Sequence, residues 1–338
     1  MTAICTGSAG RNKLSAGGTD GTGTTTTLNG RSSCATDEIS AMLADARTPV
    51  DFARHFIPEP LTPLAHTPAY RQLEPRHRLR YNQLQALFFN EQIVFFETAV
   101  GTGIMQALLR EAWPNELRAR LTEFWREELR HTEMFRDLNR RCAPELYGAG
   151  HSHFIRLAPA WTALLRWTTR HPRLFSLYLW LMLLQEERSL YYSAQFIRCK
   201  ETLEPHFVAA YRAHLIDEAG HVRCDEEVLD RWWPQTRPFL RSVNAKLLAW
   251  LVAEFFSAPK RGQLSVVDTL AAEFPELRER APELKRQLLS LSADESYQFS
   301  LYSRRITPRS FARFDQWPEF RVLERAMRGY RFAGSAVA

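Results

Sequence analysis

The sequence predicts an all-α protein, built on a four-helix bundle with additional flanking helices. Two ExxH motifs carry this prediction, Glu128-Leu129-Arg130-His131 and Glu218-Ala219-Gly220-His221. Each motif follows a glutamate, Glu97 or Glu187, by an interval of 31 residues. A proline-containing break lies halfway along each interval, as expected if each glutamate and its motif stand at one level on a pair of antiparallel helices.

The first pair of predicted helices follows from apolar spacing and one break. Apolar residues recur at helical spacing around Glu97, namely Ile93, Val94, Val100, Ile104 and Leu108. Pro114 lies near the midpoint, and proline is tolerated in the first turn of a helix but breaks its interior. A returning helix is therefore predicted to begin there and to carry Glu128 and His131 on one face.

The second pair repeats this arrangement. The longest strongly apolar run, Leu174 to Leu184, has about half the length needed to span a bilayer. We therefore predict a buried helix leading into Glu187 and no membrane segment. Pro205 lies near the second midpoint, so the helix that carries the second motif is predicted to begin there.

The rest of the chain bounds the domain organisation. Residues 1–36 are rich in Gly, Ser and Thr with almost no large apolar side chains, and we predict that they are disordered. Residues 37–338 are predicted to form a single domain. Within it, apolar spacing predicts helices that cover the bundle near 238–257 and 275–291, separated by Pro259 and Gly262.

Composition narrows the protein's partners and location. The formal net charge is +6, but the arginines are scattered rather than grouped, so no nucleic-acid partner is predicted. The N-terminal segment lacks the apolar core of a secretory signal and the five cysteines form no CxxC pair, which favours a reducing cytoplasm. There is no Gly-rich dinucleotide fingerprint, so electrons are expected from an external reductase.

The repeated motifs predict a dinuclear metal site inside the bundle. In such bundles two helices each give one glutamate and the other two each give a Glu-x-x-His. A carboxylate buried on an apolar face without a partner would be costly, which favours a ligand role for the single glutamates. Hard oxygen donors suit iron or manganese, and the imidazoles favour two iron ions.

Two other glutamates compete for places in this site. Glu91 also lies in an apolar stretch, but its midpoint with Glu128 falls inside an apparently helical segment. Glu186 adjoins Glu187, but its helix face is more mixed and includes two serines, Ser189 and Ser193. Glu97 and Glu187 are therefore predicted to be the ligands.

Three further residues are predicted to lie close to the metals. Glu127 and Asp217 precede the motif glutamates and point about 100° away from them, which suits a contact with the outer ring nitrogen of a ligand histidine. His214 lies one turn before Glu218 on the same stripe of its helix, whereas Phe124 occupies the equivalent position in the first half. A third histidine would make the site asymmetric.

The whole set resembles the site of the arylamine N-oxygenases related to p-aminobenzoate N-oxygenase, over roughly residues 75–230. Their second motif reads Asp-Glu-x-x-His, as residues 217–221 do here, whereas Glu127 stands where the first motif commonly has Asp. The resemblance implies a ferritin-like fold and oxidation of an amine by dioxygen to a hydroxylamino, nitroso or nitro group. Antibiotic biosynthesis and a homodimer are further expectations. It implies seven metal ligands, Glu97, Glu128, His131, Glu187, His214, Glu218 and His221.

Related di-iron families give the alternatives. Small subunits of ribonucleotide reductase commonly carry a radical tyrosine one turn after the first motif histidine, where this chain has Phe135. Ferritin-type storage gives no reason for His214. A desaturase or C-hydroxylase acting on an acyl or aminoacyl group bound to a carrier protein stays open, because a basic chain could dock an acidic carrier. The amine substrate, a free small molecule or one tethered to a carrier protein, also stays open.

Overall fold

The computed structural model describes residues 48–148, 150–257 and 259–333, and within these ranges the chain forms helices and loops without a β-strand. The all-α prediction is confirmed. The segment 1–36 lies outside the described residues. None of the described helices has the length and apolarity needed to cross a membrane.

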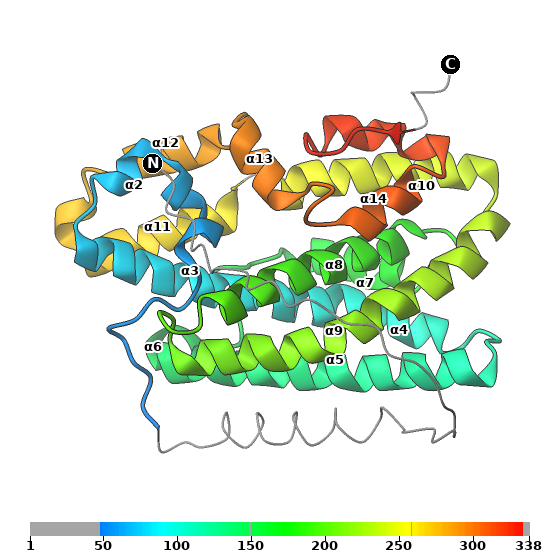
Figure 1. Cartoon of the computed structure of the whole chain (residues 1–338), viewed down its shortest axis with the longest axis horizontal. Helices are drawn as coiled ribbons and strands as arrows, with labels where there is room; N and C mark the ends of the chain where they lie inside the picture. The colour runs from blue at the N-terminus through cyan, green and yellow to red at the C-terminus, as the bar shows by residue number, and fades with distance from the viewer. Residues whose placement is uncertain (1–47, 149, 258, 334–338) are drawn as a thin grey trace, which may run out of the picture.

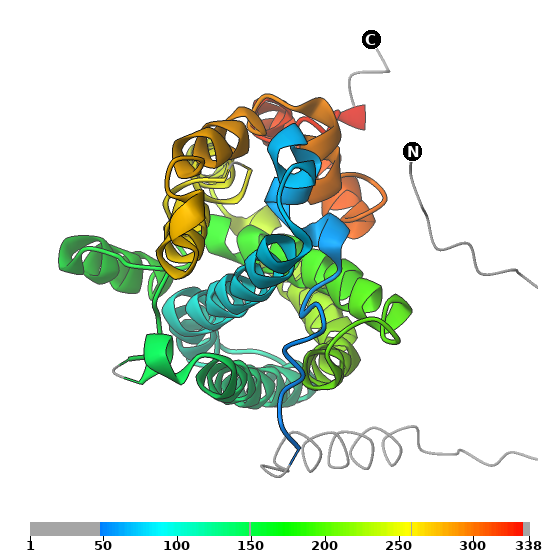
Figure 2. The same cartoon turned by 90° about the vertical axis from the view of Figure 1, so that its left-hand side faces the viewer.

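Four long helical segments form the bundle (Figures 1 and 2). The first is α3 (Pro75–Phe95), which continues through a π-helical turn, η3 (Phe96–Gly101), into α4 (Thr102–Leu108). The others are α5 (Asn115–Cys142), α8 (Leu177–Arg198) and α9 (Pro205–Trp232). The returning helices thus begin at the two predicted breaks, α5 directly after Pro114 and α9 at Pro205.

The start of α9 shows how such a break is stabilised. Glu204 precedes the helix and its side chain accepts hydrogen bonds from the backbone N–H groups of His206 and Phe207, at 2.7 and 3.1 Å. Pro205 occupies the first helical position, where its missing N–H costs no hydrogen bond. Together they fix the residue at which the helix begins, and hence the level of the second motif.

The bundle helices pack unequally. α8 packs along α9, and α5 packs against both α3 and α9, whereas α3 and α8 approach one another less closely than these pairs. The later helices lie over α3 and α8 on the side opposite α5 (Figures 1 and 2), with α11 against α3, and α10 and α14 against α8. The junction between α3 and α8, called the α3–α8 seam below, therefore lies under these covering helices.

The covering elements partly match the predicted segments. The stretch 238–257 forms α10 and a π-helical turn, and 275–291 forms a 3-10 turn and α12. The expected separation at Gly262 is wrong, because α11 begins at Arg261. A Cβ at Gly262 would lie 2.4 Å from the ring of Phe88, so this glycine allows α11 to approach α3 closely. The remaining elements are η1 (Glu59–Leu61), η2 (Pro63–His66), α2 (Pro68–Arg71), α6 (Pro144–Tyr147), α7 (Pro159–Thr169), η4 (Trp233–Gln235), α10 (Pro238–Leu251), η5 (Val252–Phe256), α11 (Arg261–Glu273), η6 (Pro275–Leu277), α12 (Ala281–Ser290), α13 (Glu295–Leu301), α14 (Pro308–Phe314) and η7 (Pro318–Arg325).

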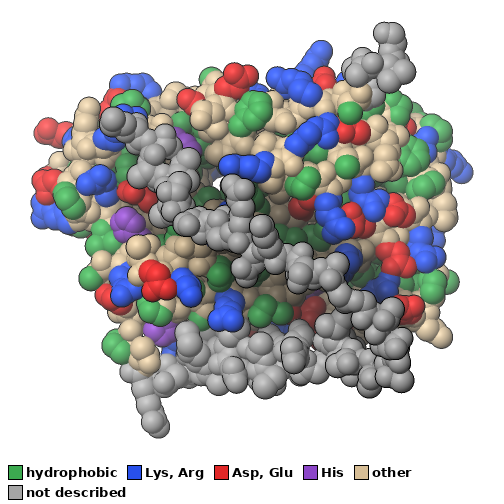
Figure 3. All heavy atoms as spheres, in the orientation of Figure 1, with side chains coloured by type: hydrophobic (Ala, Val, Ile, Leu, Met, Phe, Trp, Pro, Cys, Tyr) green, Lys and Arg blue, Asp and Glu red, His purple; other side chains and the backbone are tan. Residues whose placement is uncertain are grey.

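The surface agrees with the predicted scatter of charge. On the face shown in Figure 3, basic and acidic side chains are interspersed over the helices rather than separated into regions of one sign. Many form neighbouring pairs along one helix, such as Arg136 with Glu133 at 2.7 Å. Exposed pairs of this kind add little to stability, and they leave no broad basic patch on this face.

Candidate metal centre

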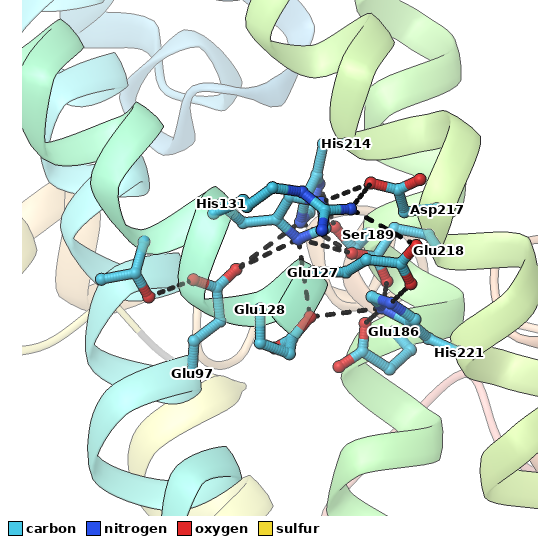
Figure 4. A network of polar contacts seen from close by, with 12 residues as sticks. Glu97, Glu127, Glu128, His131, Glu186, Ser189, His214, Asp217, Glu218 and His221 are labelled. Carbon is cyan, nitrogen blue, oxygen red and sulfur yellow. Dashed lines mark hydrogen bonds and ion pairs between the residues drawn. The ribbon is translucent and has the colours of Figure 1, made fainter. Parts of the chain in front are cut away.

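Seven ionisable side chains converge in the interior of the bundle (Figure 4). They come from all four helical segments, and each is at most 5% exposed. Glu97 lies in the π-helical turn, two residues come from α5, one from α8 and three from α9. The set is Glu97, Glu128, His131, Glu186, His214, Glu218 and His221.

The side chains form two groups, each able to hold one metal ion. In the first group, Glu97, His131 and His214 each offer a ligand atom, and these atoms all lie within 4.8 Å of one another. The carboxylate of Glu97 is 3.9 Å from His131 Nδ1 and 3.7 Å from His214 Nε2. One carboxylate and two imidazoles would thus surround the first ion.

The second group contains three carboxylates and one imidazole. The ligand atoms of Glu128, Glu186, Glu218 and His221 also lie within 4.8 Å of one another. His221 Nδ1 is 3.2 Å from Glu128, 3.5 Å from Glu218 and 3.9 Å from Glu186. This group is richer in oxygen donors than the first, so the asymmetry that His214 predicts is present in the geometry.

The two motif glutamates lie between the groups. Glu218 places Oε1 2.8 Å from His214 Nε2 and directs Oε2 toward His221. Glu128 places Oε1 3.5 Å from His131 Nδ1 and 3.2 Å from His221 Nδ1. Both carboxylates therefore stand where they can bridge two ions, one in each group.

The outer ring nitrogens of the motif histidines are held by carboxylates, as predicted for Glu127 and Asp217. His131 Nε2 lies 3.1 Å from Asp217, and His221 Nε2 lies 3.0 Å from Glu127. Each carboxylate comes from the helix of the other motif, which the sequence analysis did not anticipate. An Nε2–H that donates to a carboxylate leaves Nδ1 as a lone-pair donor directed into the site.

Unsatisfied buried atoms test whether metal ions fit this set. Buried polar atoms normally have a hydrogen-bond partner. Among the described residues, the buried atoms without one include Oε1 of Glu97 and Glu128, both carboxylate oxygens of Glu218, and Nδ1 of His131 and His221. All of them belong to the two groups. Metal ions would supply the missing partners, and the oxygen-rich donor set with imidazoles suits iron or manganese.

The structure corrects the placement of Glu187. Its carboxylate leaves the bundle interior and accepts hydrogen bonds from the backbone N–H groups of Arg309 and Ser310 and from Ser310 Oγ, at 2.7, 2.8 and 2.8 Å. Successive residues of a helix point about 100° apart, so only one of two adjacent glutamates faces the site. Glu186 does so, and Glu187 instead holds the start of α14.

The serines that made the Glu186 face look polar lie inside the bundle. Ser189 Oγ contacts His214 Nδ1 at 3.3 Å, and Ser193 is fully buried. Their hydroxyls are compatible with an interior that contains charged ligands. The polar character of this face was therefore a property of the site rather than a sign of solvent exposure.

The choice of Glu97 over Glu91 agrees with the geometry. Glu91 holds the loop after α6, where its carboxylate accepts hydrogen bonds from Tyr147, Ser152 and three successive backbone N–H groups, those of residues 153–155. Thr132 Oγ1 donates to Glu97 Oε2 at 2.7 Å, a contact that sequence reasoning missed. The available signal was its position one turn after Glu128.

One comparison decides the family. The family model described as "P-aminobenzoate N-oxygenase AurF" matches residues 44–297 of this chain. The chain belongs to the p-aminobenzoate N-oxygenase family. The resemblance drawn from the sequence is confirmed, and the protein is a di-iron N-oxygenase, an oxidoreductase that uses oxygen. A comparison with curated proteins gives no match.

Burial and mutual charge shift the pKa values inside this N-oxygenase site. Burial and the neighbouring Glu128 carboxylate raise the pKa of Glu97 to about 7. Burial lowers the pKa of His214, but the carboxylates of Glu218 and Glu97 more than offset this and raise it to about 10. Burial raises the pKa of Glu218, which the cationic forms of His214 and His221 bring well below its usual range. Without metal, protons on the histidines thus balance the carboxylates.

Metal loading of this N-oxygenase is therefore expected to release protons. A ligand imidazole must be neutral, whereas the pKa of about 10 keeps His214 protonated at pH 7. Apparent affinity for Mn²⁺ should consequently rise with pH until His214 loses its proton near pH 10. Calorimetric titration of metal-free protein at pH 7, in buffers of different ionisation enthalpy, measures the protons released. Equal heats in all buffers would contradict this charge state.

Proposed function

We propose that this protein N-oxygenates an amine, taking the amino group to a hydroxylamino, nitroso or nitro product, with two iron ions held by the seven side chains. The single observation that carries the proposal is the pair of buried groups joined by Glu128 and Glu218 in a member of an N-oxygenase family. The proposed ligands are Glu97, Glu128, His131, Glu186, His214, Glu218 and His221.

Two bound iron ions would supply the electrons that reduce dioxygen. The protein side chains position the ions and hold protons at defined atoms. Asp217 and Glu127 keep a proton on Nε2 of His131 and His221, so that Nδ1 faces the metal. Thr132 orients the carboxylate of Glu97 through its hydroxyl hydrogen bond. The fully buried surroundings exclude bulk water from the ligands.

Several finer statements belong to the same proposal. We propose iron rather than manganese because three imidazoles join the carboxylates. An external reductase is the expected electron source. The substrate is an amine that is either free or bound to a carrier protein, in a pathway such as antibiotic biosynthesis. A homodimer in the cytoplasm is the proposed state of the enzyme.

Labelled dioxygen tests the function. Iron-loaded, chemically reduced protein is supplied with ¹⁸O₂ and a set of aryl amines, and the products are weighed by mass spectrometry. We expect two iron ions per chain and ¹⁸O on nitrogen. Protein loaded with zinc, which cannot change its oxidation state, is the control and should give no product. Loss of two hydrogens without ¹⁸O would instead identify the desaturase alternative, and one iron ion per chain would contradict the dinuclear site.

A further inference from the structure

Arg188 is a cation without an acidic partner beside the metal centre. It lies on α8 two residues after Glu186, and the next residue, Ser189, contacts the proposed ligand His214. Among the described residues, no carboxylate oxygen comes within 4.0 Å of its guanidinium nitrogens. A guanidinium stays protonated in proteins, and a charge taken out of water is normally paired.

The contacts of Arg188 are all with neutral groups. Its terminal nitrogens lie 3.2 Å from Tyr192 Oη, 3.3 Å from Tyr302 Oη and 3.5 Å from Gln185 Oε1. Its Cζ lies 4.7 and 5.1 Å from the ring centres of the same two tyrosines. Nε is buried and has no hydrogen-bond partner among the described residues. The planar cation is thus held in place with one N–H left free.

Tyr302 offers a second free donor at the same place. Its hydroxyl oxygen already accepts hydrogen bonds from Gln185 Nε2, at 3.0 Å, and from Arg188. No described residue accepts the proton of this hydroxyl, although the side chain is only 1% exposed. A guanidinium N–H and a phenol O–H therefore converge without an acceptor, and a carboxylate would satisfy both.

Arg188 faces the α3–α8 seam, and aromatic side chains connect it to the first metal group. The ring of Tyr192 lies 5.6 Å from Phe89 of α3, and Phe89 lies 6.1 Å from Tyr211 of α9. Tyr211 in turn lies 6.5 Å from His214. Phe89 and Arg188 are only partly buried, unlike the core residues behind them. An aromatic substrate laid along this row would contact apolar rings between its two polar ends.

We propose that Arg188, together with Tyr302, binds a carboxylate of the amine substrate in the α3–α8 seam, while the amino group faces the metal ligands. This inference rests on the proposed function. Glu186 and Arg188 point about 200° apart on α8, so their head groups are separated by roughly a helix diameter, about 10 Å. The preferred substrate is accordingly an elongated amino acid with a carboxylate at the end remote from the amine.

Matched acid and amide substrates test this assignment. The pairs are p-aminobenzoate, 4-aminophenylacetate and 3-(4-aminophenyl)propanoate, each with its primary amide, and kcat and KM are measured for every compound. Wild type should prefer the acid of at least one pair by roughly 10- to 100-fold in kcat/KM, the contribution of a charge-assisted hydrogen bond. Arg188→Met should lose this preference through KM, and Arg188→Lys should keep part of it. Arg305→Met is the control, because Arg305 is exposed and stacks on the neighbouring Tyr191.

The outcomes separate this inference from the proposed function. Oxidation of acids and amides at equal rates by wild type, or an equal loss in Arg305→Met and Arg188→Met, overturns the role of Arg188 and leaves N-oxygenation standing. If wild type oxidises no amine, the proposed function fails, and calorimetry with the same ligand pairs on metal-loaded protein decides the inference. Tighter binding of an acid that Arg188→Met abolishes supports the site, and equal binding of acid and amide overturns it.

Discussion

Glu218→Ala is expected to remove both metal ions and the N-oxygenation activity together. Glu218 lies between the two groups, 2.8 Å from His214 through one oxygen and 3.5 Å from His221 through the other, and it is fully buried. Loss of a residue that only orients a ligand costs roughly 10- to 100-fold in metal affinity or activity, so loss of a bridging ligand should exceed that range. Iron content per chain and kcat/KM measure the effect.

Glu227→Ala provides the matched control for this substitution. Glu227 lies on the same helix, but it is partly exposed and pairs with Arg120 and Arg231 at the surface. Surface ion pairs contribute at most about 1 kcal/mol, so this variant should keep two iron ions and full activity. Retention of both ions in Glu218→Ala, with circular dichroism unchanged in both variants, would contradict the bridging position.

The adjacent substitutions Glu186→Ala and Glu187→Ala are expected to separate metal binding from folding. Glu186 belongs to the second metal group, so its loss should leave the site short of one ligand and lower kcat/KM by more than roughly 100-fold. Glu187 holds the start of α14 through three hydrogen bonds. Its loss should keep the iron and lower the free energy of unfolding by about 0.5–2 kcal/mol, as for other helix caps.

Iron content and urea unfolding, measured on both variants, decide between the two residues. The prediction requires opposite patterns, with reduced iron in Glu186→Ala and reduced stability with normal iron in Glu187→Ala. The reverse pattern, with iron lost only from Glu187→Ala, would restore the ligand assignment that the equal intervals of 31 residues favour.

Helix positions were predictable where local chemistry determines them. Pro114 and Pro205 lie at helix starts because proline lacks an N–H and fits only the first turn, and this property is visible in the sequence. Gly262 was read as a break for an equally local reason. Its actual role is the close approach of α11 to Phe88, a contact between residues far apart in the chain that no local pattern contains.

The candidate site was predictable to the extent that it repeats. Six of the seven predicted ligand positions meet in the bundle, because the ExxH spacing and the helical period fix the direction of those side chains. Glu187 was chosen by assuming equal intervals, but Glu186 stands 32 residues before Glu218. What sends Glu187 elsewhere is Ser310, more than 120 residues later in the chain, together with a π-helical turn at Glu97 that breaks the symmetry of the helices.

The contacts of Glu127 with His221 and of Asp217 with His131 bear on how such a site can be transplanted. A helical hairpin taken from either half of the chain would carry its histidine but leave behind the carboxylate that fixes the proton of that histidine. Each half of the sequence repeat is therefore incomplete as a building block. A designer who grafts this centre onto another scaffold must move α5 and α9 as one unit, in their mutual register.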